Sequence, residues 1–439
     1  MNKHPDFDVV VVGAGPAGAA AALEAARAGR SVALLERGPY PGAKNVYGGV
    51  VYGSVLDELA PGWPEHMPVQ RWVTRRSTML LTDHQALTVD FRTEDWGSAP
   101  YNGATALRAE LDGWLVSLAQ EAGAVLVPST TATGLLRDAD GRVTGVRTDR
   151  PDGELTAGVV IACDGVNSFL AKEAGLFAGV PGRQAEHTSL GVKETLALPR
   201  EVIEERFGLS GRHGQDIEIL GGTGGIPGGG FLYTNLDSVS IGVVLSLTGL
   251  AASGVRPEEV LAELKAHPAV APLIRGGELK EYSAHLIPEG GYDTMPELVG
   301  DGILVAGDAA AMCLAAGVWL EGVNYALGSG MHAGRAAAAA CAGADTSAAA
   351  LAGYRRALDD SFVLQDLRRL RRVPQLVFSD RVQRAYPRLL CDLVQGFFTV
   401  DNRRPKPRLR ALARSAARRH GVRLRHVLSD SFTGWRSFG

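Results

Sequence analysis

The chain has 439 residues, of which 46% are hydrophobic, a length and composition that predict a large buried core divided between two or three domains. A formal net charge of −3 gives no case for nucleic-acid binding, and four scattered cysteines without a CxxC pair fit neither a disulfide framework nor a zinc or iron–sulfur site. No apolar stretch of about 18 residues and no secretory signal is found, so we expect a cytoplasmic protein with reduced thiols.

The segment from Asp8 to Glu36 predicts a strand, a glycine-rich turn, a helix and a second strand in direct succession. Four valines at 9–12 indicate a buried parallel strand, and the alanine-rich residues 19–28 indicate a close-packed helix. The turn, which we predict to bind a pyrophosphate at the start of the helix, consists of Gly13, Ala14, Gly15, Pro16, Ala17 and Gly18. Glu36 ends the second strand, where an acid binds the ribose hydroxyls of adenosine. We therefore expect an ADP-containing dinucleotide.

Two later predicted strands each end in an aspartate. Residues 156–162 precede Asp164 and Gly165, and residues 303–306 precede Gly307 and Asp308. Each aspartate by itself is more typical of a turn or a helix cap. At the carboxyl end of a strand in an open α/β sheet, however, it lies where ligands bind. A carboxylate there suits the polyhydroxyl ribityl chain of FAD, which NAD lacks, so the three motifs in this order favour FAD.

The order of these motifs resembles the large family of FAD enzymes that includes aromatic hydroxylases and geranylgeranyl reductases. Two further stretches, 36–49 and 284–292, are similar to those of the electron transfer flavoprotein–quinone oxidoreductases, especially their bacterial FixC branch. The resemblance extends over residues 6 to about 400. It implies an α/β fold with a discontinuous, Rossmann-like FAD-binding domain of the aromatic-hydroxylase type, an antiparallel-sheet substrate domain and a helical C-terminal region.

The resemblance also implies cofactor contacts outside the glycine-rich turn. Arg108 matches an arginine that heads a helix and contacts the pyrophosphate, with a surface arginine as the alternative. Gly48 and Gly49 match a loop beside the flavin ring, where the absence of side chains lets the backbone approach. A helix is predicted over 318–341, and its first amides would stabilise the reduced flavin. The further positions implied to bind the cofactor are Arg37, Ala132, Gly322, Val323 and Asn324.

The motifs divide the chain into three parts. The FAD-binding domain is expected to comprise residues 1–75, 101–185 and 285–345, the substrate or quinone domain residues 76–100 and 186–284, and the helical C-terminal region with its basic tail residues 346–439. The glycine run at 221–230 predicts a flexible loop between strands, with Ile226, Phe231 and Leu232 exposed near it.

The C-terminal tail leaves two interpretations open. Residues 403–428 contain ten lysines and arginines and no acid. A solvated, partly disordered extension is one interpretation. The other is a basic segment that lies on anionic lipid or on an acidic partner, with Leu409, Leu412 and Leu424 as anchors.

The resemblance implies that the protein accepts electrons from an electron transfer flavoprotein and reduces a membrane quinone, which would place it peripherally on the inner face of the cell membrane. Single-chain members of the family hold a [4Fe–4S] cluster on four cysteines, but only Cys341 and Cys391 follow Cys313 here. We therefore expect no metal in this chain and a separate ferredoxin-like iron–sulfur subunit. Because the cofactor would carry the chemistry, no catalytic acid or base is predicted. His285 and Tyr292 are candidates for positions near the quinone, although His285 is more typical of a structural histidine.

Other functions remain open at this point. One is a stand-alone FAD-dependent reductase or monooxygenase of a hydrophobic small molecule, such as an isoprenoid or a natural product. Hydroxylases of the wider family commonly follow their Gly-Asp-Ala-Ala motif with a His and a Pro, which residues 311–317 lack. The other is a structural FAD-binding subunit of a larger complex.

Overall fold

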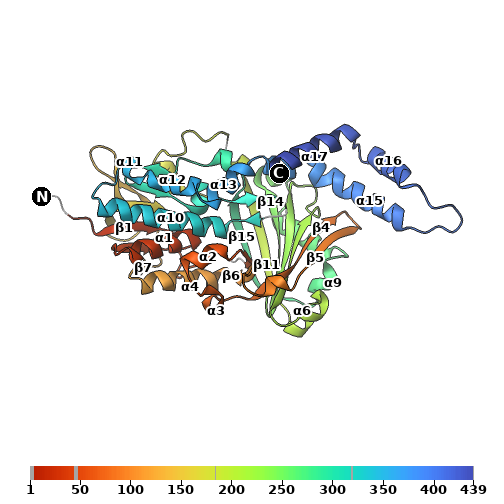
Figure 1. The fold of residues 1–439 in the computed structure, drawn as a ribbon, viewed down its shortest axis with the longest axis horizontal. Helices are drawn as coiled ribbons and strands as arrows, with labels where there is room; N and C mark the ends of the chain where they lie inside the picture. The colour runs from red at the N-terminus through yellow and green to blue at the C-terminus, as the bar shows by residue number, and fades with distance from the viewer. Residues whose placement is uncertain (1–3, 44–47, 183, 318–319, 439) are drawn as a thin grey trace.

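The computed structural model describes residues 4–43, 48–182, 184–317 and 320–438. Two predicted features extend beyond them: positions 44–47 of the 36–49 stretch and positions 318–319 of the predicted helix lie outside the described residues. Figure 1 shows a first sheet with its helices at one end of the molecule, a second sheet beside it, and C-terminal helices that project beyond the second sheet as an arm.

The first sheet is built around β1 (Phe7–Val12), which pairs in parallel with β10 (Glu154–Ala162) and β2 (Val32–Leu35). Parallel pairing continues to β17 (Ile303–Val305) beyond β10 and to β7 (Val125–Val127) beyond β2, while β16 (Val299–Gly300) and the hairpin β8 (Ala132–Arg137) and β9 (Val143–Thr148) add antiparallel strands. Valines 9–12 are buried, as a strand covered on both faces requires. Because the strands are parallel, the carboxyl ends of β1, β10 and β17 meet at one edge, and the three predicted motifs meet there too.

Two helices that cover this sheet approach each other closely. They are α1 (Pro16–Arg27) and α10 (Val323–Ala342). A Cβ atom on Gly330 would lie 2.0 Å from the carbonyl oxygen of Ala17, and one on Gly334 would lie 2.3 Å from that of Ala21. The small residues of both helices therefore allow direct backbone packing. This contact fixes the start of α10 relative to the glycine-rich turn.

The second sheet is mostly antiparallel. Its strands lie in the order β15 (Glu278–Pro288), β11 (Thr188–Ala197), β14 (Ser238–Ser246), β13 (Gly228–Thr234), β12 (His213–Leu220), β4 (Arg71–Leu81), β6 (Ala104–Leu107) and β3 (Gly48–Val51), with β5 (Ala86–Arg92) on β4. One face carries apolar side chains such as Ile217 and Ile241, which are buried under α6 (Arg200–Phe207) and α8 (Pro257–Ala266). The alternate residues of these strands point to the opposite face.

The second sheet differs from expectation in two respects. The glycine run does not end in an exposed apolar loop: β13 begins at Gly228, and Ile226, Phe231 and Leu232 are all buried. The predicted exposure was wrong because both faces of β13 are covered. In addition, β4 and β15 cross the predicted domain boundaries at 75/76 and 284/285, and β3 and β6 join this sheet although they were assigned to the FAD-binding domain.

The C-terminal region is helical. It contains α11 (Ala348–Leu351), α12 (Gly353–Asp359), α13 (Phe362–Arg369), α14 (Val373–Val377), a π-helical turn η5 (Arg381–Ala385), α15 (Tyr386–Phe398), α16 (Leu409–Arg419) and α17 (Leu424–Phe438). The basic tail thus forms two helices, and it is tied to the preceding ones: Arg419 pairs with Asp392 at 2.7 Å and Arg381 with Asp430 at 2.6 Å. Among the residues described, no helix is both long and apolar enough to cross a membrane.

The remaining helices are short or lie at the edges of the two sheets. They are α2 (Ser54–Leu59), α3 (Trp63–His66), α4 (Arg108–Glu121), α5 (Phe169–Glu173), α7 (Leu247–Ser253) and α9 (Ala271–Ile274). Of these, α4 packs against α1 and brings its first residue, Arg108, to the glycine-rich turn.

Candidate cofactor and active site

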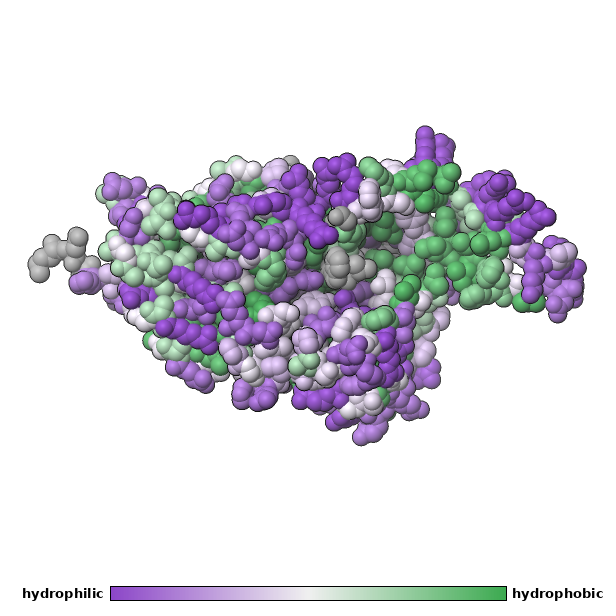
Figure 2. Space-filling view, viewed as in Figure 1, coloured by the Kyte–Doolittle hydropathy of each residue, from purple (hydrophilic) through white to green (hydrophobic). Residues whose placement is uncertain are grey.

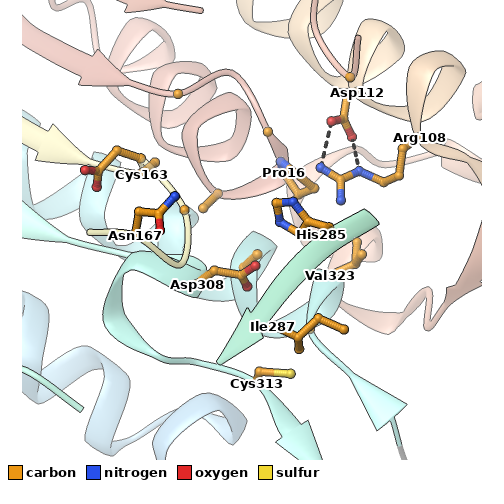
Figure 3. A pocket seen from close by; sticks show the side chains of 18 of the residues that line it. Pro16, Arg108, Asp112, Cys163, Asn167, His285, Ile287, Asp308, Cys313 and Val323 are labelled. Carbon is orange, nitrogen blue, oxygen red and sulfur yellow. Dashed lines mark hydrogen bonds and ion pairs between the residues drawn. The ribbon is translucent and has the colours of Figure 1, made fainter. Parts of the chain in front are cut away.

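A cavity of about 380 Å³ lies between the carboxyl edge of the first sheet and the second sheet. Its lining extends from Glu36 and Thr131 at one strand end, past Gly15 and Asp308, to residues of β11, β13 and β15. Figure 3 shows side chains from both sheets directed into this space, with Pro16 and Val323 at the starts of α1 and α10. The site is therefore elongated, with different chemistry along its length.

The glycine-rich turn places backbone amides at the cavity wall. Gly13 has a φ of +100°, and a Cβ atom there would lie 2.3 Å from the carbonyl oxygen of Cys163, so this turn requires glycine. Gly15 is the N-cap of α1 and provides no side-chain cap, which leaves the first helical amides available to an anion. Glu36 accepts hydrogen bonds from the Ala14 amide at 3.1 Å and the Gly38 amide at 2.5 Å. Its carboxylate still has lone pairs for ribose hydroxyls.

Arg108 and Asp112 form a buried, bidentate ion pair beside this turn (Figure 3). Arg108 donates to the two carboxylate oxygens of Asp112 at 2.7 and 2.8 Å. Asp112 is fully buried, so desolvation raises the pKa of its carboxyl group, and attraction to Arg108 opposes that rise. The pair holds the guanidinium at the cavity wall, close to Gly15. A fixed cation at this position suits a pyrophosphate.

Asp164 and Asp308 face the cavity from the ends of β10 and β17. Asp164 accepts a hydrogen bond from the Leu170 amide at 3.1 Å, while its other carboxylate oxygen is buried without a partner among the described residues. Burial raises the pKa of both aspartates. Attraction to His285 opposes the rise at Asp308, while burial lowers the pKa of His285 itself. Both carboxyl groups therefore favour a ligand that offers hydrogen-bond donors.

The register of the second sheet explains which residues form the opposite wall. Gly191 of β11 pairs with His285 of β15, and Lys193, two residues along, pairs with Ser283. Across β14, the row of Lys193 continues through Gly242 to Phe231 of β13, and Tyr233 lies two residues further along on the same face. Gly191, Lys193, Phe231, Tyr233, Ser283 and His285 all line the cavity. Lys193 is buried, and this desolvation lowers its pKa to about 7, although attraction to Glu281 opposes the fall.

The structure places most of the predicted site residues around this one cavity. Those that line it are Gly13, Gly15, Pro16, Ala17, Glu36, Arg37, Arg108, Ala132, Asp164, Gly165, Asp308, Gly322 and Val323. Six others do not line it. Ala14 donates a hydrogen bond to Glu36, and Asn324 donates one to Glu321. Gly18 packs against the backbone of Gly13, Gly307 packs against Ala17, and Gly48 and Gly49 pair with β6. Tyr292 points elsewhere, since its hydroxyl accepts hydrogen bonds from Arg355 and Arg368.

Sequence analysis missed the residues that the second sheet contributes. These are Gly191, Lys193, Tyr233, Val244, Ser283, Ile287 and Glu289, while Phe231 was expected in an exposed loop instead. The alternation of side chains along β11 and β13 was a usable signal, but it does not reveal which face meets the cofactor domain. Glu36 lies toward one end of the cavity, the Arg108 cation and the Asp164 oxygen also line it, and the apolar side chains of Phe231, Val244 and Ile287 lie on the wall formed by the second sheet. This arrangement fits a long dinucleotide with a ring system at one end, as FAD has.

Comparisons with known proteins agree with this geometry. Residues 8–197 match the family model described as FAD dependent oxidoreductase, and residues 373–439 match the ETF-QO/FixC family C-terminal domain. The chain is 40% identical to a probable electron transfer flavoprotein–quinone oxidoreductase, YdiS, of Escherichia coli K12, over 98% of both chains. It is 43% identical to protein FixC of Bradyrhizobium diazoefficiens, over 90% of this chain and 91% of that one.

Solved structures share the fold at low sequence identity. A geranylgeranyl bacteriochlorophyll reductase-like protein of Thermoplasma acidophilum superposes with a TM-score of 0.69 at 19% identity, covering 94% of this chain and 95% of the other. The flavin-dependent brominase Bmp2 gives a TM-score of 0.65 at 16% identity, covering 99% and 100%. The predicted fold class is thereby confirmed, and the match to the FAD dependent oxidoreductase family confirms the predicted cofactor, FAD.

Proposed function

Because the chain belongs to the family of electron transfer flavoprotein–quinone oxidoreductases and FixC proteins, we propose that this FAD-dependent oxidoreductase passes electrons from an electron transfer flavoprotein to a membrane quinone. The observation that supports this most directly is the near full-length similarity, which includes the C-terminal region specific to the family. Bound FAD supplies both one-electron and two-electron chemistry, which such a junction requires.

Each part of the cavity has a role in this proposal. Glu36 and Arg37 hold the adenosine end, and Arg108, kept in place by Asp112, neutralises the pyrophosphate. Asp308 accepts hydrogen bonds from the ribityl chain. The start of α10, at Gly322 and Val323, presents amides whose partial positive charge favours a reduced, anionic ring. The apolar side chains of Phe231, Val244 and Ile287 on the second sheet exclude water from that ring.

The electron path predicts a specific pattern of donors and acceptors. Reduced electron transfer flavoprotein should bleach the bound FAD in stopped-flow absorbance measurements, and a quinone analogue should restore the colour. NADH or NADPH alone should reduce it slowly, because the chain has no second dinucleotide motif.

The alternatives give different outcomes in the same instrument. Rapid reduction by NADPH, stimulated by an aromatic or isoprenoid compound, would support a stand-alone monooxygenase or reductase and contradict the proposal. Failure of every donor to reduce the FAD would favour a structural FAD-binding subunit.

A separate ferredoxin-like iron–sulfur subunit is part of the same proposal, because no group of His, Cys, Asp or Glu among the described residues is arranged to hold a metal.

We further propose that the C-terminal arm, residues 386–438, lies on an anionic membrane surface, where the quinone is found. Its exposed large apolar side chains are Leu390, Phe397, Phe398, Val400, Leu409, Leu424, Val427, Leu428, Phe432 and Trp435. Figure 2 shows hydrophobic residues gathered around the base of the arm and hydrophilic ones at its tip. Apolar side chains next to exposed arginines are typical of helices that lie in a membrane interface.

Substitutions on the arm should weaken membrane binding and leave the cofactor site intact. We expect Arg410→Glu/Arg414→Glu to lower binding to anionic lipid vesicles by roughly tenfold or more at low salt, since each basic residue near the surface contributes about 1 kcal/mol. The loss should shrink as salt is added, because screening removes the same attraction. Flavin absorbance should remain unchanged. The exposed Arg275 on the body provides a control, as Arg275→Glu should bind like the unaltered protein. Equal binding by all variants in a co-sedimentation assay would contradict the proposal.

A further inference from the structure

Two glutamates line a second, smaller cavity beside the main one, and one of them, Glu289, also lines the main cavity. The smaller cavity, of about 40 Å³, is lined by Glu218, Glu289, apolar residues of the second sheet and Val377 and Phe378 at the end of α14. Glu289, Phe231 and Val244 line both cavities. Glu289 thus borders the flavin-binding space directly, and Glu218 faces it across the smaller cavity.

Glu289 follows β15 and is partly buried at the wall of the main cavity. Ser189 of β11 donates a hydrogen bond from its hydroxyl group to the Glu289 carboxyl group. Burial raises the pKa of Glu289 to about 7, and the Ser189 hydrogen bond opposes that rise. A substantial fraction of this group is therefore protonated at neutral pH.

Glu218 lies on β12, on the same face as Asp216. Its side chain hydrogen-bonds to the Asp216 carboxyl group and the Tyr233 hydroxyl group, and burial followed by repulsion from Asp216 raises its pKa well above the ordinary value. Asp216 in turn accepts a hydrogen bond from Arg76 at 3.0 Å, and the Arg76 side chain is 19% exposed. This series of polar groups extends from the small cavity toward the protein surface.

Such a series is unusual for a sheet interior. Buried carboxylates are costly unless they are paired, and here several acids face one arginine. Tyr52, Arg76, Asp216 and Tyr233 are the titratable or charged groups around Glu218, and Cys313 lies near Glu289. Glu321 in turn acts on Tyr52, Arg76 and Cys313. Apolar residues would pack this space more stably, so the acids require a functional explanation.

We propose that Glu289 and Glu218 form a proton relay that delivers protons to the quinone as it is reduced. The inference rests on the proposed function: a quinone that receives two electrons also takes up two protons to become a quinol, and groups of the protein would supply them. The O–H bond of the Glu289 carboxyl group breaks, and an O–H bond forms on a quinone carbonyl oxygen. Glu218 then reprotonates the Glu289 carboxylate across the small cavity that both residues line, and it recovers its proton from solvent by way of Asp216. The same cycle supplies the second proton of the quinol.

The relay predicts that Glu289→Gln and Glu218→Gln slow electron transfer to an acceptor that takes up protons and do not slow transfer to one that takes up none. Quinone reduction should fall by roughly a hundredfold, as is typical for the loss of a positioned proton donor. Reduction of ferricyanide, which takes up no proton, should be unchanged, as should the FAD content. Glu278, exposed at the start of the same strand, provides the matched control, and Glu278→Gln should behave like the unaltered protein in both assays.

The pH dependence provides a second test. Because Glu289 donates only when protonated, quinone reduction by the unaltered protein should decline as the pH rises through about 7. Ser189→Ala removes a hydrogen bond that favours the carboxylate, so this decline should move to higher pH, a change that a purely structural role would not produce.

A third measurement does not depend on activity. In the cofactor-free protein, a raised Glu289 pKa means that the folded state binds more protons than the unfolded state, so thermal stability should fall as the pH rises toward 7. Glu289→Gln should remove this component.

The outcomes distinguish the relay from the function on which it rests. If the unaltered protein does not reduce quinone, the proposed function is wrong. If it does, and the glutamine variants reduce quinone at the same rate with the same pH profile, the relay is wrong.

Discussion

Gly18→Ala is expected to destabilise the protein severely, whereas Gly15→Ala should leave the fold intact and remove the cofactor. A Cβ atom on Gly18 would lie 1.8 Å from the carbonyl oxygen of Gly13, which no rotation of a side chain relieves. The start of α1 would have to move away from β1, at a cost on the order of 3 kcal/mol or more. At Gly15, by contrast, the nearest atom to a Cβ is Arg108 Nη2 at 3.4 Å, an ordinary contact. The added methyl group would instead occupy the space expected for the pyrophosphate.

The two variants need two measurements each. Urea unfolding of the cofactor-free proteins should show a large loss of stability for Gly18→Ala and a change within about 1 kcal/mol for Gly15→Ala. Flavin absorbance after desalting should be lost in both. Wild-type flavin content in Gly15→Ala would mean that the pyrophosphate does not bind at this turn, and wild-type stability in Gly18→Ala would contradict the packing of α1 on β1.

The parts of the fold that sequence predicted well are those specified by residues close together in the chain. The valine run, the glycine-rich turn and Glu36 lie within one strand–helix–strand unit, so their spacing alone fixes their relative positions. Asp164 and Asp308 could be added because parallel strands place their carboxyl ends at a common edge. Arg108 could be placed only through family resemblance, since nothing in the sequence around it shows that α4 begins beside Gly15.

The second wall of the cavity could not be predicted, because it depends on register between strands far apart in sequence. Lys193, Tyr233 and Glu289 become neighbours of the site only through the pairing of β11, β13 and β15. A shift of one residue would turn each of them to the other face. The same reasoning explains the error at Phe231, which was expected to be exposed. Its strand continues beyond the glycines, and both faces of that strand are covered.

Arg108→Ala is the other substitution with a large expected effect, because it leaves a buried carboxylate without its cation. Asp112 is completely buried and accepts two hydrogen bonds from Arg108. Removal of one partner of a buried ion pair typically costs about 3–5 kcal/mol of folding free energy. Arg108 also attracts Asp308 and lies at the wall where the pyrophosphate is expected, so FAD affinity should fall as well.

The pH dependence of that variant identifies the cause. Without Arg108, the burial that already raises the pKa of Asp112 acts unopposed, so the folded state holds a proton that the unfolded state releases. Stability is then greatest below the ordinary aspartate pKa and declines as the pH rises through the raised value, so the penalty of Arg108→Ala should be small in acid and large at neutral pH.

The double variant Arg108→Met/Asp112→Leu removes both charges, and it should recover most of the stability in urea unfolding at neutral pH, since apolar residues can replace a buried pair. It should not recover flavin binding. Recovery of both would show that Arg108 only supports the fold, while a pH-independent penalty in the single variant would mean that Asp112 does not remain buried when Arg108 is absent.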